Sequence, residues 1–78
     1  MTIYSKELRY LAKRLKDARV SAGLDQTAAA RKFGKTQSFI SKIESGQRRI
    51  CVLQLIRFMK IYARPSGYFI NGLLSGNI

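Results

Sequence analysis

Residues 23–49, GLDQTAAARKFGKTQSFISKIESGQRR, contain two short segments with helix signals at both ends. The first segment covers residues 26–33. Asp25 precedes it, and a carboxylate at that position can accept hydrogen bonds from the free N–H groups of a helix start. Gly34 follows it, and glycine often ends a helix in the left-handed conformation. These signals predict a helix of about two turns.

A second helix is predicted at residues 37–45. Thr36 can cap its start, and Gly46 can end it. Only three residues, 34–36, separate it from the preceding helix. Two short helices joined by such a brief turn indicate a helix-turn-helix.

Three further segments outside this pair also have helical patterns. Residues 5–22 carry apolar side chains at spacings of three and four, namely Leu8, Leu11, Leu15 and Ala18. Residues 52–63 are almost continuously apolar, so we expect this helix to lie mostly in the core. Residues 65–74 form the last predicted helix, with Pro65 in its first turn. The sequence therefore predicts an all-α fold of five helices in a single domain, residues 1–78, with a core of about 5–74 and a frayed tail at 75–78.

The last helix is more apolar than a short terminal helix on a small domain can bury. An exposed apolar patch of this kind is typical of a subunit interface. The candidate dimer surface consists of Tyr68, Phe69, Leu73 and Leu74.

Net charge is the strongest compositional signal. Fifteen Lys and Arg residues face four acidic residues, which gives a net charge of +11. Such an excess favours a polyanionic partner, and nucleic acid is the first candidate, while improved solubility is the weaker alternative. The single cysteine rules out an internal disulfide framework and fits a reducing compartment. With no apolar run of about 20 residues, a membrane span is not expected, and we expect a cytoplasmic protein.

Catalytic and cofactor chemistry find no support in the sequence. The chain has no histidine, so a zinc site has too few ligands, and no metal or other cofactor is expected. No nucleophile is paired with a base in a recognisable pattern. We therefore expect a binding protein and not an enzyme.

Residues 23–49 resemble the lambda-repressor-like helix-turn-helix family of DNA-binding regulators. The flanking segments LKDAR, residues 15–19, and VLQLIRFMKIY, residues 52–62, match as well, so that the resemblance covers roughly residues 8–70. It implies a compact five-helix domain with the helix-turn-helix at its second and third helices. Two residues depart from the family pattern. Cys51 stands where relatives usually have Asp, and Ala29 replaces a common Leu, whose place in the core Phe33 can fill.

The third helix would be the recognition helix of such a domain. Its polar positions lie opposite Ile40 and Ile43 and would face base edges in the major groove. The predicted base contacts are Gln37, Ser38, Ser41 and Lys42. The predicted phosphate contacts are Gln26, Thr36, Arg48 and Arg49. We expect Phe39 to pack against a neighbouring helix, and Cys51 to be half-buried and unreactive.

The resemblance also implies a structural ion pair between Arg19 and Glu44, which would tie the first helix to the recognition helix. The predicted function is a sequence-specific transcriptional regulator that binds double-stranded DNA as a homodimer on a near-palindromic operator. The alternative is a DNA-binding antitoxin, whose partner would be a toxin protein docked on the last helix.

Overall fold

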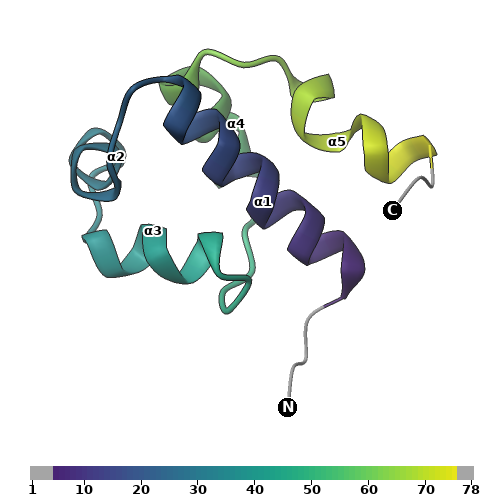
Figure 1. Cartoon of the computed structure of the whole chain (residues 1–78), viewed down its shortest axis with the longest axis horizontal. Coiled ribbons are helices and arrows are strands. Elements are labelled where there is room, and N and C mark those ends of the chain that lie inside the picture. Colours follow the sequence, from purple (N-terminus) through teal and green to yellow (C-terminus); the bar gives the residue numbers. More distant parts are fainter. Residues whose placement is uncertain (1–4, 76–78) are drawn as a thin grey trace.

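The computed structural model describes residues 5–75, and they form five α-helices, as the sequence predicts (Figure 1). The helices are α1 (Lys6–Ser21), α2 (Gln26–Phe33), α3 (Gln37–Glu44), α4 (Val52–Tyr62) and α5 (Ser66–Ser75). The described residues include no β-strand. None of the described helices is long and apolar enough to cross a bilayer. The expected frayed tail lies outside the described residues, except for Ser75, which ends α5.

The helix boundaries follow from local capping. Ser5 caps α1, since its hydroxyl oxygen accepts a hydrogen bond of 3.1 Å from the N–H of Leu8. Asp25 caps α2 in the same way, with 2.7 Å to the N–H of Ala28. Gly34 ends α2 with φ +80°, a conformation that costs other residues energy. The predicted turn of the helix-turn-helix is therefore confirmed.

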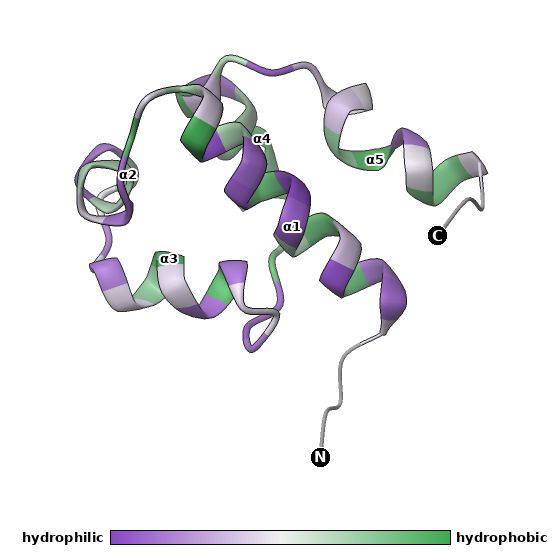
Figure 2. Cartoon of the chain, in the orientation of Figure 1, coloured by the Kyte–Doolittle hydropathy of each residue, from purple (hydrophilic) through white to green (hydrophobic). Residues whose placement is uncertain are grey.

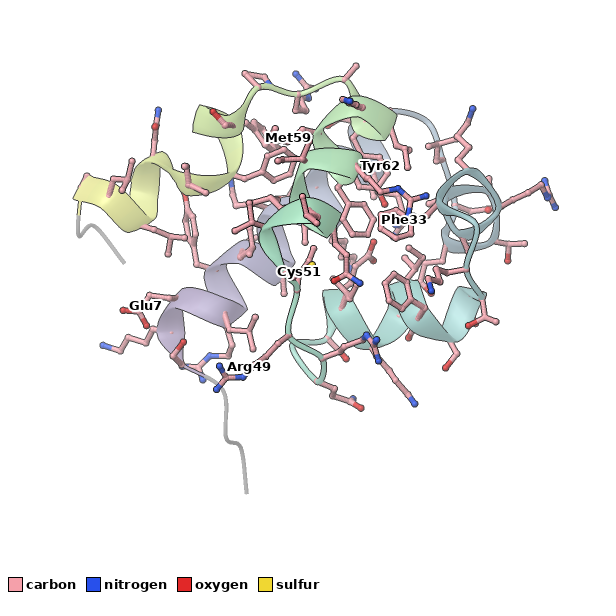
Figure 3. All side chains as sticks on the ribbon, turned by 180° about the vertical axis from the view of Figure 1, so that it is seen from behind. Glu7, Phe33, Arg49, Cys51, Met59 and Tyr62 are labelled. Carbon is pink, nitrogen blue, oxygen red and sulfur yellow. The ribbon has the colours of Figure 1, made fainter. Side chains whose placement is uncertain are left out.

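A row of aromatic rings forms the centre of the core. Phe33 of α2 lies with its ring centroid 4.4 Å from that of Phe58 of α4 and 5.3 Å from that of Phe39 of α3. Tyr62 continues the row, 5.4 Å from Phe58 (Figure 3). Both Phe33 and Ala29 are buried, so the large ring fills space beside the small residue.

Helix α1 lies at the middle of the fold, with α2 and α3 on one side and α5 on the other (Figure 1). Hydrophobic and hydrophilic residues alternate along it within each turn (Figure 2). Its buried positions include Leu15 and Ala18, at the predicted spacing. One helix thus supports both the helix-turn-helix and the C-terminal helix.

Helix α5 packs against α1 through a polar clamp and a close approach. Arg14 donates from Nε to the carbonyl oxygen of Tyr68 at 2.8 Å, and its guanidinium carbon lies 3.8 Å from the centroid of the Tyr68 ring. One turn further along, Gly72 faces the ring of Tyr10. Phe69 is fully buried between these contacts. The prediction that Phe69 lies on an exposed dimer surface is therefore wrong, because α1 already covers it.

The prediction that α4 lies mostly in the core is also wrong for its first turns. Val52 and Leu53 are 71% and 73% exposed, and Ile56 is exposed as well. The physical reason is that a helix on the edge of a small domain buries only one face, which here carries Phe58 and Tyr62. The three exposed side chains share the start of α4, and we call them the α4 apolar face.

Cys51 is exposed, where the sequence predicted a half-buried residue. It occupies the position before α4, and its backbone N–H donates to Oε1 of Gln54 at 3.2 Å. A side chain from within α4 thus stabilises the start of this helix. In the family that the sequence resembles, an aspartate usually occupies the position of Cys51 and caps the helix.

Candidate nucleic-acid interface

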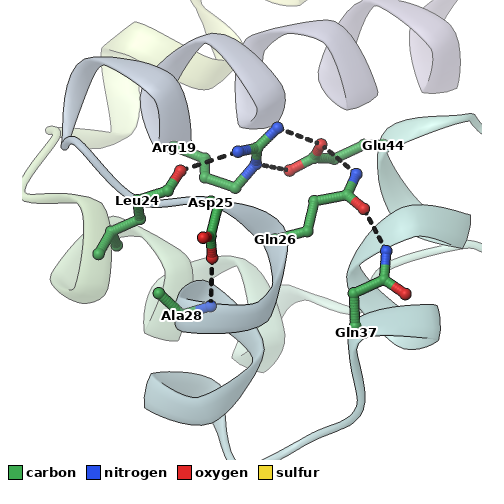
Figure 4. Close-up of polar contacts among 7 residues, drawn as sticks. All are labelled: Arg19, Leu24, Asp25, Gln26, Ala28, Gln37 and Glu44. Carbon is green, nitrogen blue, oxygen red and sulfur yellow. Dashed lines mark hydrogen bonds and ion pairs between the residues drawn. The ribbon is translucent and has the colours of Figure 1, made fainter.

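A buried ion pair joins α1 to the end of α3. Arg19 places Nε 2.7 Å from Oε2 of Glu44, and its Nη2 donates to Oε1 at 3.1 Å (Figure 4). A third donor, Nη1, bonds the carbonyl oxygen of Leu24 at 2.8 Å. The two side chains are only 10% and 4% exposed. This is the pair predicted from the sequence, and its two-pronged geometry fixes the orientation of α3 against α1.

The ion pair continues into a chain of amides that reaches the protein surface. Gln26 donates from Nε2 to Oε1 of Glu44 at 3.1 Å. Its own oxygen accepts a short hydrogen bond from Nε2 of Gln37, the first residue of α3 (Figure 4). We call the series Arg19, Glu44, Gln26 and Gln37 the relay.

The carboxylate of Glu44 fixes the donor and the acceptor of every hydrogen bond in the relay. A carboxylate accepts only, so the NH₂ group of Gln26 must face Glu44 and its oxygen must face Gln37. Gln37 therefore spends one N–H on Gln26 and keeps its oxygen and its second N–H. That donor and acceptor are the pair that matches N7 and N6 of adenine.

Two pKa shifts reflect the same environment. The hydrogen bond to Glu44 raises the pKa of Arg19, although burial of the guanidinium opposes this effect. Tyr62 is buried close to the pair, and desolvation of its hydroxyl raises its pKa. Both groups therefore keep their protons throughout the physiological range.

The exposed side of α3 carries the four residues predicted to contact bases. Gln37, Ser38 and Lys42 are exposed, and Ser41 is half-buried. Ile40 and Ile43 are buried on the opposite side. The structure thus brings the four predicted residues together on one helical face, which is of a size to enter the major groove.

The residues predicted to contact phosphate are separated by the fold. Thr36 caps α3, accepting from the N–H of Phe39 at 3.2 Å, and its hydroxyl hydrogen remains available to a phosphate. The guanidinium carbon of Arg48 lies 4.9 Å from the centroid of the Phe39 ring. Phe39 itself is buried, as predicted. Thr36 and Arg48 thus lie beside the recognition helix.

Arg49 takes a different direction from its neighbour Arg48. It lines a depression with Ser5, Glu7 and Leu8 at the start of α1. Figure 3 shows Arg49 on the same side of the molecule as Glu7. The structure therefore does not bring Arg49 together with the face of α3.

Two basic residues that were not predicted also lie near α3. Lys35 has its ammonium nitrogen 5.8 Å from the centroid of the Phe39 ring, on the same edge of α3 as Arg48. Lys16 of α1 lines a depression with Gln26 and Ser41. The position of Lys35 directly before Thr36 was a usable signal. Lys16 gave none, because it is one of several basic residues on the outer side of its helix.

Comparison with known proteins agrees with this geometry. The helix-turn-helix family model matches residues 15–69. A search of curated protein sequences gives no significant match to this chain.

Among solved structures, the wild-type restriction-modification controller protein C.Esp1396I is 25% identical, with a TM-score of 0.78, over 91% of this chain and 93% of that one. The tetramer of that protein in complex with its natural 35 base-pair operator matches with 25% identity and a TM-score of 0.77, over the same shares. The controller protein C.AhdI from Aeromonas hydrophila is 22% identical, with a TM-score of 0.74, over 81% of this chain and 91% of that one. The family match covers most of the chain, and the fold agrees with it: the chain belongs to the Cro/C1-type helix-turn-helix family of DNA-binding regulators.

Proposed function

We propose that the chain is a transcriptional regulator that reads a specific DNA sequence with α3 in the major groove. The observation that carries this proposal is the relay, which holds the amide of Gln37 in one orientation on an exposed polar face. On a surface helix that only faces water, an exposed amide needs no fixed orientation. Here the amide of Gln37 is held in place through three other side chains, those of the relay. The net charge of +11 supplies attraction to the phosphate backbone. We expect the regulator to act in the cytoplasm, as a single domain and without catalysis.

The experiment that tests sequence reading is selection from a random duplex library at about 0.15 M salt, where weak charge attraction is screened. Enrichment of one motif is the expected result. Binding without any enrichment would contradict sequence-specific reading and leave a basic domain with general DNA affinity.

Gln37→Ala should relax the preference at one base pair of the enriched motif. The expected loss is about 1–3 kcal/mol on the preferred base, with little change on the other three. Competition binding against four duplexes that differ at that base pair measures it. Arg48→Ala is the control and should weaken all four equally, because a phosphate contact carries no sequence information. An equal loss on all four duplexes with Gln37→Ala would contradict base reading by this residue.

We also propose that the regulator is a homodimer on a near-palindromic operator. Two recognition helices would then be spaced by about 34 Å, one turn of DNA. The α4 apolar face supports the proposal, since it leaves three large apolar side chains in water on a small domain. Leu74, part of the dimer surface that the sequence predicts, is also exposed, while Tyr68 and Leu73 are half-buried. For the controller protein C.Esp1396I, a tetramer on its operator is known.

Leu53→Glu should convert the dimer to a monomer, because association would bury a charge without a partner. Sedimentation at increasing protein concentration measures the effect, and we expect at least a hundredfold weaker association, about 2.7 kcal/mol. Leu74→Glu is the matched control on α5. If Leu74→Glu abolished dimers and Leu53→Glu did not, the α5 surface would be the interface instead.

The antitoxin alternative finds no support in the comparisons, one of which describes the controller protein C.Esp1396I in complex with operator DNA. Co-purification of a small second protein with this chain would be the observation that favours it.

A further inference from the structure

A groove runs along α1 beside the C-terminal half of α3. Its first part is lined by Arg9, Ala12, Lys13, Lys16, Glu44 and Ser45. Its second part shares three of these residues, Lys16, Glu44 and Ser45, and adds Gln26 and Ser41. The groove therefore connects the basic side of α1 to two of the residues predicted to contact DNA.

The charge in this groove is positive. Glu44 contributes little negative potential, since Arg19 and Gln26 occupy its oxygens and the side chain is 4% exposed. Lys13 is held 3.4 Å from Asp17, which offsets part of its charge. The exposed side chain of Lys16 makes no hydrogen bond or ion pair within residues 5–75. The ammonium group of Lys16 is thus available to bind an anion in the groove.

The position of the groove relative to α3 follows from helical geometry. At 100° per residue, Glu44 lies at one border of the base-facing residues, next to Gln37 and Ser41. Phe39 lies at the other border, next to Lys42. Arg48 and Lys35 flank the Phe39 side. The groove with Lys16 flanks the opposite side.

A helix in the major groove has a phosphate strand on each side, about 12 Å apart across the groove. On one of these two strands, the phosphates would be bound by Arg48, Lys35 and Thr36. We propose that the α1 groove, through Lys16 and with Arg9 and Lys13 further along, binds the phosphates of the other strand. The inference rests on the proposed function, because it assumes that α3 enters the major groove. It adds a second phosphate-binding edge on a helix that lies outside the helix-turn-helix.

The test is the salt dependence of binding to a duplex that carries the enriched motif. Lys16→Gln should reduce the slope of log affinity against log salt by about 0.9, the value of one lost phosphate contact. Between about 50 and 200 mM salt, the variant should therefore lose about 3.5-fold less affinity than the unaltered protein. Base preference should stay the same, since phosphates carry no sequence information.

Lys32→Gln is the matched control, because it removes the same charge. Lys32 lines a different depression, with Ser21, Ile61 and Arg64 at the far ends of α1 and α4. For the Lys32→Gln variant, the slope of log affinity against log salt should equal that of the unaltered protein. Equal slopes for Lys16→Gln and Lys32→Gln would overturn the inference and leave the proposed function intact. Absence of any enriched motif with the unaltered protein would overturn both.

Discussion

Glu44→Ala should reduce the free energy of unfolding by about 3–5 kcal/mol, measured by urea denaturation. The substitution removes the carboxylate that neutralises Arg19 and leaves a guanidinium almost fully buried, with only the carbonyl oxygen of Leu24 as a partner. A domain of this size has a small core and little stability in reserve. We therefore expect the variant to be largely unfolded at 37 °C.

A double variant separates the structural role of the pair from its role in reading DNA. Arg19→Met with Glu44→Leu replaces both charges by apolar groups, and such exchanges often restore stability. Gln26 would then lack its anchor, so the amide of Gln37 would no longer be held in one orientation. We expect the double variant to fold and to bind DNA with reduced discrimination at the base pair that Gln37 reads.

For the single variant Glu44→Ala, a loss below about 1 kcal/mol in the free energy of unfolding would be typical of an exposed ion pair. Such a result would contradict the structural role of the buried pair.

Gly72→Ala should destabilise the protein by about 1–3 kcal/mol, although alanine favours a helix over glycine. A Cβ on residue 72 would lie 2.5 Å from Cζ of Tyr10, a rigid ring on α1. The two helices would have to separate, which disturbs the packing of Phe69 between them. Thermal unfolding of the variant measures the cost.

Gly67→Ala is the matched control on the same helix. Its Cβ would meet the side-chain amide of Asn71 at 2.9 Å, and that flexible group can rotate away. We expect a neutral or slightly stabilising effect there. Adding Tyr10→Leu to Gly72→Ala should recover part of the loss by making room. Equal effects of the two glycine substitutions would contradict the close approach of α5 to α1.

Local signals predicted the helix-turn-helix well. The bounds of α2 follow from Asp25 and Gly34, and the start of α3 from Thr36, because a cap acts within one turn of the chain. The exposed polar face of α3 was equally predictable from the periodicity of an α-helix. These are properties of short segments, and the surrounding fold does not alter them.

The apolar surfaces of α4 and α5 could not be assigned in this way. Apolar content tells how much surface a helix has to bury, but not which neighbour covers it. Phe69 is buried because α1 lies against it, and Leu53 is exposed because none of the helices within residues 5–75 covers the outer side of α4. In the same way, the adjacent Arg48 and Arg49 point to different parts of the molecule. Such outcomes depend on tertiary packing.

The relay also divides the reading positions into two groups with different freedom to change during evolution. A residue at position 37 that cannot donate would leave the oxygen of Gln26 without its partner, so mutations at these two sites are coupled. Ser38 and Lys42 have no side-chain hydrogen bonds within residues 5–75 and can vary one at a time. Homologues that acquire a new operator should therefore diverge first at positions 38 and 42, and should change positions 26 and 37 together.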